Sequence, residues 1–190
     1  MSRRVLFVCW PYAGHLMPHM GIAGALRARG EEVAFLTGTA ALPTLGAADM
    51  AATAVRAVDE RAAGAAVAEL ERAAGARRPS VGDVRRCFDH WLLDTIPGQV
   101  QDLRDAIAQR RPDVIVSDIA LWAPLVITAE TTGIPVALAT IFMGPPAGAP
   151  EVPHPGLGLP APASAASRAL SWSVAHATDV LAGRMRRRLD

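Results

Sequence analysis

The stretch VLFVCWPYAGHLMPHMGIAGALRARGEEVAFLT, residues 5–37, decides how this chain folds. Its first five residues, 5–9, are apolar and start with a β-branched residue, which is typical of a fully buried strand. Residues 33–37 form a second apolar run of the same kind. Between the two runs, apolar residues recur at helical spacing from Met20 to Leu26, and Gly30 stands where a glycine commonly follows a helix.

A strand, a helix and a second strand in this order predict two parallel strands joined by a right-handed crossover. Ligands of such sheets bind beyond the carboxyl ends of the strands. His15 lies in the loop that is expected to follow the first strand. The pattern therefore places a titratable side chain where the chemistry of this fold class usually occurs.

Composition limits the class of protein. The chain has 190 residues, of which 51% are hydrophobic and 19% are charged, so it is long enough for one domain with a substantial core. Its net charge of +1 provides no basic field that would favour nucleic acid as a partner. The two cysteines, Cys9 and Cys87, are predicted to be free thiols in a reducing compartment.

The start of the chain resembles an export signal only superficially. Arg3 and Arg4 precede the apolar residues 5–9, a run shorter than the ~7–15 residues that the apolar part of a signal peptide needs. No stretch reaches the ~18 uninterrupted apolar residues of a membrane helix. We therefore expect a cytoplasmic protein that does not insert stably into membranes.

A second strand–helix–strand unit lies further along the chain. Residues 112–118 are predicted to form a short strand, 122–132 a helix that ends at Gly133, and 134–139 the next strand. Two such units predict an α/β fold with a doubly wound, mostly parallel, Rossmann-like sheet. The segments between the units are predicted to hold a weak strand at 52–58 and helices at 60–76, at 81–93 with Ser80 as the cap, and at 99–109.

Residues 144–162, GPPAGAPEVPHPGLGLPAP, are so rich in Pro and Gly that no sheet strand would tolerate them. This segment is either a lid over a ligand or a surface loop, and a last helix is expected over 164–189. The chain shows no metal-ligand spacing, GxGxxG, phosphate-binding loop or GxSxG. Dinucleotide-binding and hydrolase motifs are therefore absent from the sequence.

The two units resemble the opening of the inverting glycosyltransferases of the UDP-glycosyltransferase superfamily (family one), which have the two-domain GT-B fold. The first unit shares the family's Gly-His turn, the following proline, the Arg-Gly pair and the strand that ends in Thr, at Gly14, His15, Pro18, Leu26, Arg29, Gly30, Val33 and Thr37. The second unit shares Pro112, Asp113 and Asp118, and also the step at 133–136. Glu31 departs from the family, which commonly has His at that position. The loop at 144–162 resembles the acceptor loop of bacterial natural-product members.

The resemblance covers nearly the whole chain, yet only about the first half of such an enzyme. It implies that residues 1–190 form the N-terminal, acceptor-binding domain of a GT-B architecture and that the C-terminal domain for the nucleotide sugar is absent. The acceptor would be a small hydrophobic natural product. The donor would be a UDP- or dTDP-linked sugar, with no other cofactor and no metal. Whether the chain forms a homodimer is left open.

By the same resemblance, His15 is the catalytic base and Asp118 is its partner. Sugar transfer with inversion needs a nucleophilic hydroxyl, and a positioned base contributes ~10²–10⁴-fold. Imidazole suits this task because its ordinary pKa of ~6.5 lies near neutral pH, and a carboxylate on the other ring nitrogen orients the ring. The alternative, non-catalytic interpretations are that His15 is a surface residue and that Asp118 only caps the next helix. His19, four residues further on, is interpreted as a surface residue.

The residues expected to contact the acceptor are one glycine and several bulky groups near strand ends or on helices: Tyr12, Gly14, Met17, His90, Trp91, Phe142 and Met143. Loops at strand ends line the cleft of such folds, which favours Tyr12, Phe142 and Met143 among them. Two other functions stay open. The chain could be a non-catalytic acceptor-binding or partner subunit of a split glycosyltransferase. It could also be an unrelated flavodoxin-like or hydrolase-like α/β domain. No GxSxG supports a hydrolase, and bound FMN would colour a flavodoxin-like protein yellow.

Overall fold

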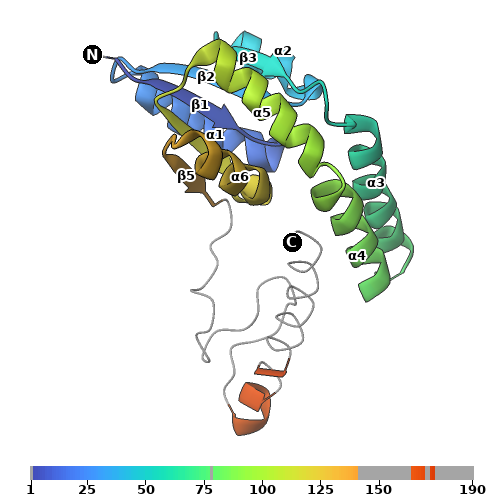
Figure 1. The fold of residues 1–190 in the computed structure, drawn as a ribbon. Helices are drawn as coiled ribbons and strands as arrows, with labels where there is room; N and C mark the ends of the chain where they lie inside the picture. The colour runs from blue at the N-terminus through green and yellow to red at the C-terminus, as the bar shows by residue number, and fades with distance from the viewer. Residues whose placement is uncertain (1, 78, 141–163, 170–171, 174–190) are drawn as a thin grey trace. The chain divides into compact units, whose positions relative to one another are not determined.

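The structure is a computed structural model that describes residues 2–77, 79–140, 164–169 and 172–173. The chain divides into two compact units, Met1–Ile141 and Phe142–Asp190. The first unit contains a five-stranded sheet (Figure 1). Its strands are β1 (Arg4–Val8), β2 (Glu32–Thr37), β3 (Ala51–Ala54), β4 (Val114–Asp118) and β5 (Val136–Ala139). They lie in the order β3-β2-β1-β4-β5 and every neighbouring pair is parallel, which confirms the predicted doubly wound α/β fold.

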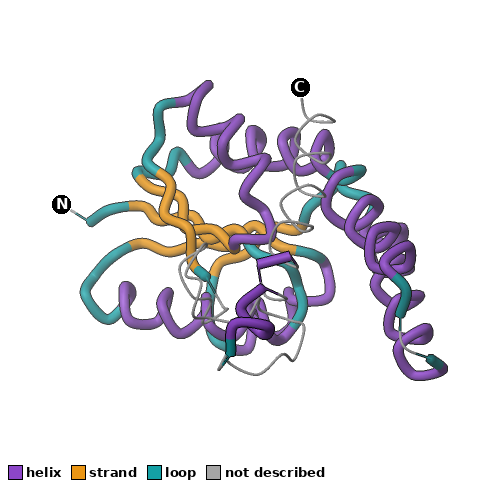
Figure 2. Tube along the Cα trace, turned by 90° about the horizontal axis from the view of Figure 1, so that it is seen from below, coloured by secondary structure: helices purple, strands orange, loops and turns teal. Residues whose placement is uncertain are grey.

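Helices cover both faces of this sheet (Figure 2). They are α1 (Ala13–Arg27), α2 (Leu42–Ala47), α3 (Glu60–Ala76), α4 (Val81–Phe88), α5 (Ile96–Arg110) and α6 (Trp122–Thr132). The 3-10 turns η1 (Thr39–Ala41) and η3 (Ile119–Leu121) lead from β2 into α2 and from β4 into α6, and η2 (Asp89–Leu93), a turn of π-helix, connects α4 to α5. Helices α3 and α4 lie side by side (Figure 1).

Two apolar cores lie on the two faces of the sheet, because successive strand residues point to opposite faces. On one face, Leu6, Val8 and Leu36 pack in one cluster with Leu103 and Ala106 of α5. On the other face, a second cluster joins Phe7 and Phe35, whose rings stack at 5.0 Å, to Leu16 and Ala23 of α1 and Leu45 of α2. β1 contributes to both cores and lies in the middle of the sheet, as its unbroken apolar run predicted.

The element boundaries follow local chemistry. α3 spans 60–76 as predicted, and the side chain of Asp59 caps it by accepting from the N–H of Ala62 at 2.9 Å. The predicted cap of α4 is also present, since Ser80 and Asp83 form a reciprocal capping box. α6 ends at Gly133, whose φ of 69° is a left-handed conformation that glycine adopts without strain.

Several predicted boundaries need correction. The strand expected at 52–58 is only the four residues of β3, and the strands expected at 112–118 and 134–139 begin two residues later. The helix expected at 81–93 ends at Phe88 and continues as the π-turn η2. The predicted loop 144–162 lies outside the described residues. Of the helix predicted at 164–189, the described part is helical at 165–169 and 172–173.

Two carboxylates accept hydrogen bonds from backbone N–H groups at the amino edge of the sheet. Asp113 accepts from the backbone N–H of Arg4 at 2.8 Å and pairs with its guanidinium at 3.0 Å, which holds the pKa of this carboxyl below its usual value. Glu31, the residue that departs from the family pattern, accepts from the backbone N–H of Arg3 at 2.6 Å. Both contacts tie the start of β1 to a neighbouring segment. In the part of the chain that the structure describes, no helix is long and apolar enough to cross a membrane.

Candidate active site

His15 and Asp118 meet at the carboxyl edge of the sheet, although 103 residues separate them. β1 and β4 are neighbours, and Val8 near the end of β1 pairs with Ser117. Asp118 ends β4, while the chain leaves β1 through Cys9 and Trp10 and enters α1, whose first turn carries His15. The strand order reverses between β1 and β4, which is the place where open α/β sheets bind ligands.

The carboxylate of Asp118 serves two partners. Oδ2 contacts Nδ1 of His15, and Oδ1 accepts from the backbone N–H of Ala120 at 2.9 Å, which caps the turn η3. The Asp118 side chain is fully buried, whereas that of His15 is 14% exposed. Because the carboxylate accepts at Nδ1, that nitrogen carries the proton in neutral His15. Nε2 is then the basic nitrogen of the ring.

The structure places His15 in the first helical turn of α1, which corrects the prediction that it lies in a loop. It also corrects the interpretation of His19 as a surface residue, because His19 is completely buried. Nδ1 of His19 lies 2.6 Å from the carbonyl oxygen of His15, and its ring packs edge-on against Phe7. His19 therefore belongs to the core beneath the helix.

Aromatic rings surround His15. Tyr12 and Trp91 approach its imidazole edge-to-face, with ring centroids 6.1 and 6.2 Å away. Trp10 packs against both of these rings, and Phe88 packs against Trp91. Burial raises the pKa of the Tyr12 hydroxyl. The phenol therefore stays neutral at neutral pH. We call Tyr12, Trp91, Trp10 and Phe88 the aromatic wall.

The other residues predicted to contact an acceptor are scattered. Gly14 is exposed and directly precedes His15 in the first turn of α1. Met17 is 56% exposed on α1. His90 is exposed, and its Nδ1 lies 2.7 Å from Asp94 in a separate cleft of about 340 Å³. Phe142 and Met143 lie outside the described residues. The structure thus brings Tyr12, Gly14 and Trp91 to His15, and it places His90 in another cleft.

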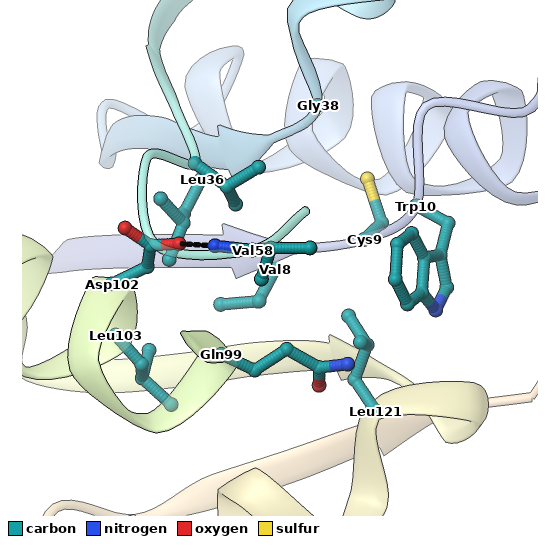
Figure 3. Close-up of a pocket in the computed structure, with 11 residues that line it drawn as sticks. Val8, Cys9, Trp10, Leu36, Gly38, Val58, Gln99, Asp102, Leu103 and Leu121 are labelled. Atoms are coloured by element: carbon teal, nitrogen blue, oxygen red, sulfur yellow. Dashed lines mark hydrogen bonds between the residues drawn. The ribbon is translucent and has the colours of Figure 1, made fainter. Parts of the chain in front are cut away.

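A small cavity of about 30 Å³ lies at the strand ends on the α5 side of the sheet (Figure 3). Trp10, Gln99 and Asp102 are among the residues that line it. Asp102 is buried and fastens the segment after β3, because its two oxygens accept from the backbone N–H groups of residues 56–58 at 2.8–3.1 Å. Gly98 permits this close approach, since a Cβ there would lie 2.6 Å from the carbonyl oxygen of Ala57.

Comparison with known proteins adds to this geometry. No family model matches the chain. A curated relative, the demethyllactenocin mycarosyltransferase of Streptomyces fradiae, is 33% identical over 144 residues, which are 72% of this chain and 29% of that enzyme. The chain is thus similar in sequence to one part of a natural-product glycosyltransferase. It therefore spans less than a third of the length of the curated enzyme that it matches.

Solved structures of glycosyltransferases share the fold of this chain. The glycotransferase of kitacinnamycin superposes with a TM-score of 0.55 at 19% identity, covering 74% of this chain and 31% of that one. SnogD from Streptomyces nogalater gives 0.54 at 20% identity, with coverages of 74% and 33%. SsfS6 from Streptomyces sp. SF2575 gives 0.54 at 19% identity, with coverages of 76% and 41%.

Both cysteines of this chain are free and buried. Burial raises the pKa of the Cys9 thiol to about 12, and burial also raises the pKa of the Cys87 thiol. Neither thiol is therefore suited to nucleophilic chemistry at neutral pH. The described residues also include no group of three or more His, Cys, Asp or Glu side chains that could hold a metal ion.

Sequence reasoning missed three residues near the site. Phe88 lies three residues before Trp91 in the helix predicted at 81–93, and this helical spacing was the available signal for their contact. Gln99 and Asp102 are buried polar residues of α5. Their three-residue spacing, with Leu103 beside them, places them on the apolar side of that helix, and this spacing was the available signal.

Proposed function

We propose that this chain is the acceptor-binding part of an inverting glycosyltransferase, with residues 1–190 belonging to its N-terminal domain. The enzyme would move a sugar from a nucleoside-diphosphate sugar to a hydroxyl of a small hydrophobic natural product. The observation that carries the proposal is the contact between Nδ1 of His15 and the buried Asp118 at the switch point of the sheet. The aromatic wall beside that contact suits an apolar acceptor.

In the proposed reaction His15 is the general base. The acceptor oxygen attacks the anomeric carbon while its proton passes to Nε2 of His15. The bond between the anomeric carbon and the diphosphate oxygen breaks, and the diphosphate leaves with the electron pair, so the configuration inverts. Asp118 keeps Nδ1 protonated and stabilises the imidazolium that forms.

The donor is proposed to be UDP- or dTDP-linked. SsfS6, whose fold resembles this chain with a TM-score of 0.53 at 19% identity, has been solved in complex with thymidine diphosphate. The name of the curated relative describes transfer of a mycarosyl group. In our proposal the nucleotide is held by a part of the enzyme that corresponds to the uncovered length of these relatives.

The test joins the chain to such a nucleotide-binding part. The chain is fused to the portion of the mycarosyltransferase that it does not cover, and the fusion is incubated with dTDP- and UDP-sugars and a panel of aromatic and macrocyclic alcohols. Mass spectrometry then detects glycosides, and NMR establishes whether the anomeric configuration is inverted. We expect an inverted glycoside from the fusion and none from the chain alone. A retained configuration would contradict the proposal.

Variants of the fusion test the roles of the two residues. We expect His15→Gln, which keeps a hydrogen-bond donor toward Asp118 but has no basic nitrogen, to lower turnover by ~10²–10⁴-fold. His15→Ala should be equally impaired, and Asp118→Asn should also lose turnover because the amide cannot stabilise the imidazolium. Asp105→Asn, an exposed change on α5, is the matched control and should be unaffected. Near-full turnover by either His15 variant would refute the assignment of the base.

A further inference from the structure

Trp91 lies at the centre of the aromatic wall. Its ring contacts those of Trp10, Tyr12 and Phe88, with centroids 5.7, 6.0 and 6.3 Å away. It also meets the imidazole of His15 at an angle of 88°, with centroids 6.2 Å apart. Tyr12 belongs to the same segment as His15, whereas Trp91 comes from a distant part of the chain, the π-turn η2. The conformation of η2 therefore decides whether the indole lies beside the proposed base.

The contact with Asp118 does not by itself fix the imidazole of His15. A hydrogen bond tolerates a deviation of about 30° from a straight line, whereas a catalytic group has to be held within about 10–20° and 0.5 Å. Edge-to-face contacts with aromatic rings restrict this remaining swing, and the contact with Trp91 is one of them. Displacement of Trp91 would therefore leave Nε2 of His15 less precisely placed toward the acceptor.

The indole of Trp91 has no hydrogen bond of its own to hold it. Its Nε1 is buried and has no partner in the part of the chain that the structure describes, so the ring depends on its ring contacts and on the backbone turn that carries it. In this turn the N–H of Asp94 donates to the carbonyl oxygen of Asp89, five residues back, at 2.9 Å. Such π-turns are rare. We therefore looked for contacts that hold η2 against the regular helical register.

The hydroxyl of Thr95 makes such a contact. Thr95 is the N-cap residue of α5, where a threonine side chain usually accepts from an N–H group of the first helical turn. It makes no capping bond here. Instead, Oγ1 of Thr95 donates to the carbonyl oxygen of Trp91 at 2.7 Å and accepts from Nε2 of Gln99 at 2.6 Å. A hydroxyl bonded to the carbonyl four residues back often bends a helix, and this one ties α5 to the backbone of Trp91 itself.

Burial distinguishes this pair from another side-chain contact of the turn. Thr95 is 6% exposed and Gln99 is 8% exposed, so water competes little for their hydrogen bonds. His90 and Asp94 also pair across the turn at 2.7 Å, but their side chains are 59% and 65% exposed. Exposed pairs of this kind contribute little to stability. The Thr95–Gln99 pair is therefore the contact that should decide the register of η2.

We infer that Thr95 and Gln99 are positioning residues for His15, because their hydrogen-bonded pair holds η2 in the register that places Trp91 against the imidazole. The inference rests on the proposed function, in which His15 is the base. The two residues act through Trp91 and not by contact with the reacting atoms. Loss of the pair should displace Trp91 and slow the chemical step, and it should leave the binding of the nucleotide sugar unchanged.

The first measurement uses the chain as it is. NMR records the ring-proton signals of His15, which the ring current of a neighbouring indole shifts, and Trp91→Leu defines where these signals lie without the indole. We expect Thr95→Val, which keeps the shape of threonine but lacks the hydroxyl, to move the His15 signals toward their position in Trp91→Leu. Thr95→Ser, which keeps the hydroxyl, should leave them unmoved.

Thr131→Val is the matched control for the loss of a hydroxyl. The Thr131 hydroxyl also donates to the carbonyl oxygen four residues back, that of Ile127 at 2.9 Å, but it does so in α6. This variant should not move the His15 signals. Circular dichroism shows whether each variant is folded. If Thr95→Val does not fold, Gln99→Met, which removes the amide at similar side-chain length, decides the question in the same way.

Two results of this measurement would overturn the inference. One is a folded Thr95→Val or Gln99→Met chain in which the His15 signals stay where they are in the unaltered chain. The other is an equal movement of these signals in Thr95→Ser and Thr95→Val, since the hydroxyl would then not be the group that holds the turn.

Kinetics of the fusion enzyme supply the second measurement. Thr95→Val should lower kcat by about 10–100-fold, since a misplacement of about 1 Å can cost that much. The KM for the nucleotide sugar should not change, and Thr95→Ser should retain most of the turnover. If the fusion depends on His15 but Thr95→Val turns over as fast as the unaltered fusion, only the positioning role is wrong. If the His15 signals move as expected but no fusion transfers sugar, the proposed function is wrong, while the placement of Trp91 by the Thr95–Gln99 pair stands.

Discussion

The carboxylate of Asp102 should be a principal tie between α5 and the segment that follows β3. It accepts four hydrogen bonds from the backbone N–H groups of residues 56–58. Arg56 and Ala57 are exposed, so water can replace the carboxylate at their N–H groups after Asp102→Ala. Val58 is 7% exposed, and its N–H would be left unpaired. One buried N–H without a partner, together with two N–H groups that bond to water in place of the carboxylate, predicts a loss of about 2–4 kcal/mol in the free energy of unfolding.

Urea denaturation followed by circular dichroism measures this loss at neutral pH. Asp102→Asn should cost less than Asp102→Ala because the amide oxygen still accepts, although its NH₂ group faces N–H donors. Asp105→Ala, an exposed change on the same helix, is the control and should lie within about 0.5 kcal/mol of the unaltered chain. If Asp102→Ala is as stable as this control, with an unchanged m value, the carboxylate does not hold the two segments together and the reasoning fails.

Three further predictions concern other parts of the first unit. Cys9, whose thiol pKa is raised to about 12, and Cys87 should resist alkylation by iodoacetamide in the native chain and react on unfolding, as mass spectrometry would show; rapid native labelling would contradict their burial. The Arg77 guanidinium holds the pKa of Asp83 below its usual value, so the stability that this carboxylate adds should be present above about pH 4 and be lost as the pH falls further. The difference in Tm between the unaltered chain and Asp83→Asn should therefore shrink in acid, and a difference that stays constant with pH would contradict this role of Asp83. Gly98→Ala gains about 1 kcal/mol of helix propensity, but its Cβ would lie 2.6 Å from the carbonyl oxygen of Ala57. Urea titration should therefore show a net loss of about 1–3 kcal/mol in the free energy of unfolding, and a gain would show that α5 can move away from Ala57.

The sequence predicted most accurately those elements whose ends carry their own chemical signals. α3 begins after a capping Asp59 and α6 ends at Gly133, and both were predicted with the bounds that the structure shows. Strand ends were less accurate, because a strand ends where its partner ends, and the partner is not visible in the local sequence. β3 is an example, since its pairing with β2 covers only Ala51–Ala54.

Two features of the site region depend on packing that local patterns do not reveal. The π-turn after α4 changes the helical register, and Trp91 within it is part of the aromatic wall, whereas His90 beside it lines another cleft. His19 was predicted to be a surface residue because the sequence offered no further ligands that would make His15 and His19 a metal pair. Yet Leu16, His19 and Ala23 recur at the spacing of one helix face, and all three are buried. That stripe was the signal that should have placed His19 in the core.

The pairing of His15 with Asp118 shows why two interpretations of a residue need not exclude each other. A carboxylate after a strand is usually a cap, and Oδ1 of Asp118 does cap the next turn. A carboxylate has a second oxygen, however, and Oδ2 reaches His15 because β1 and β4 are neighbours at the point where the strand order reverses. Had β4 been added beside β3, the same two residues would lie at opposite sides of the sheet. The cap follows from the local sequence, whereas the proposed catalytic pair depends on the strand order.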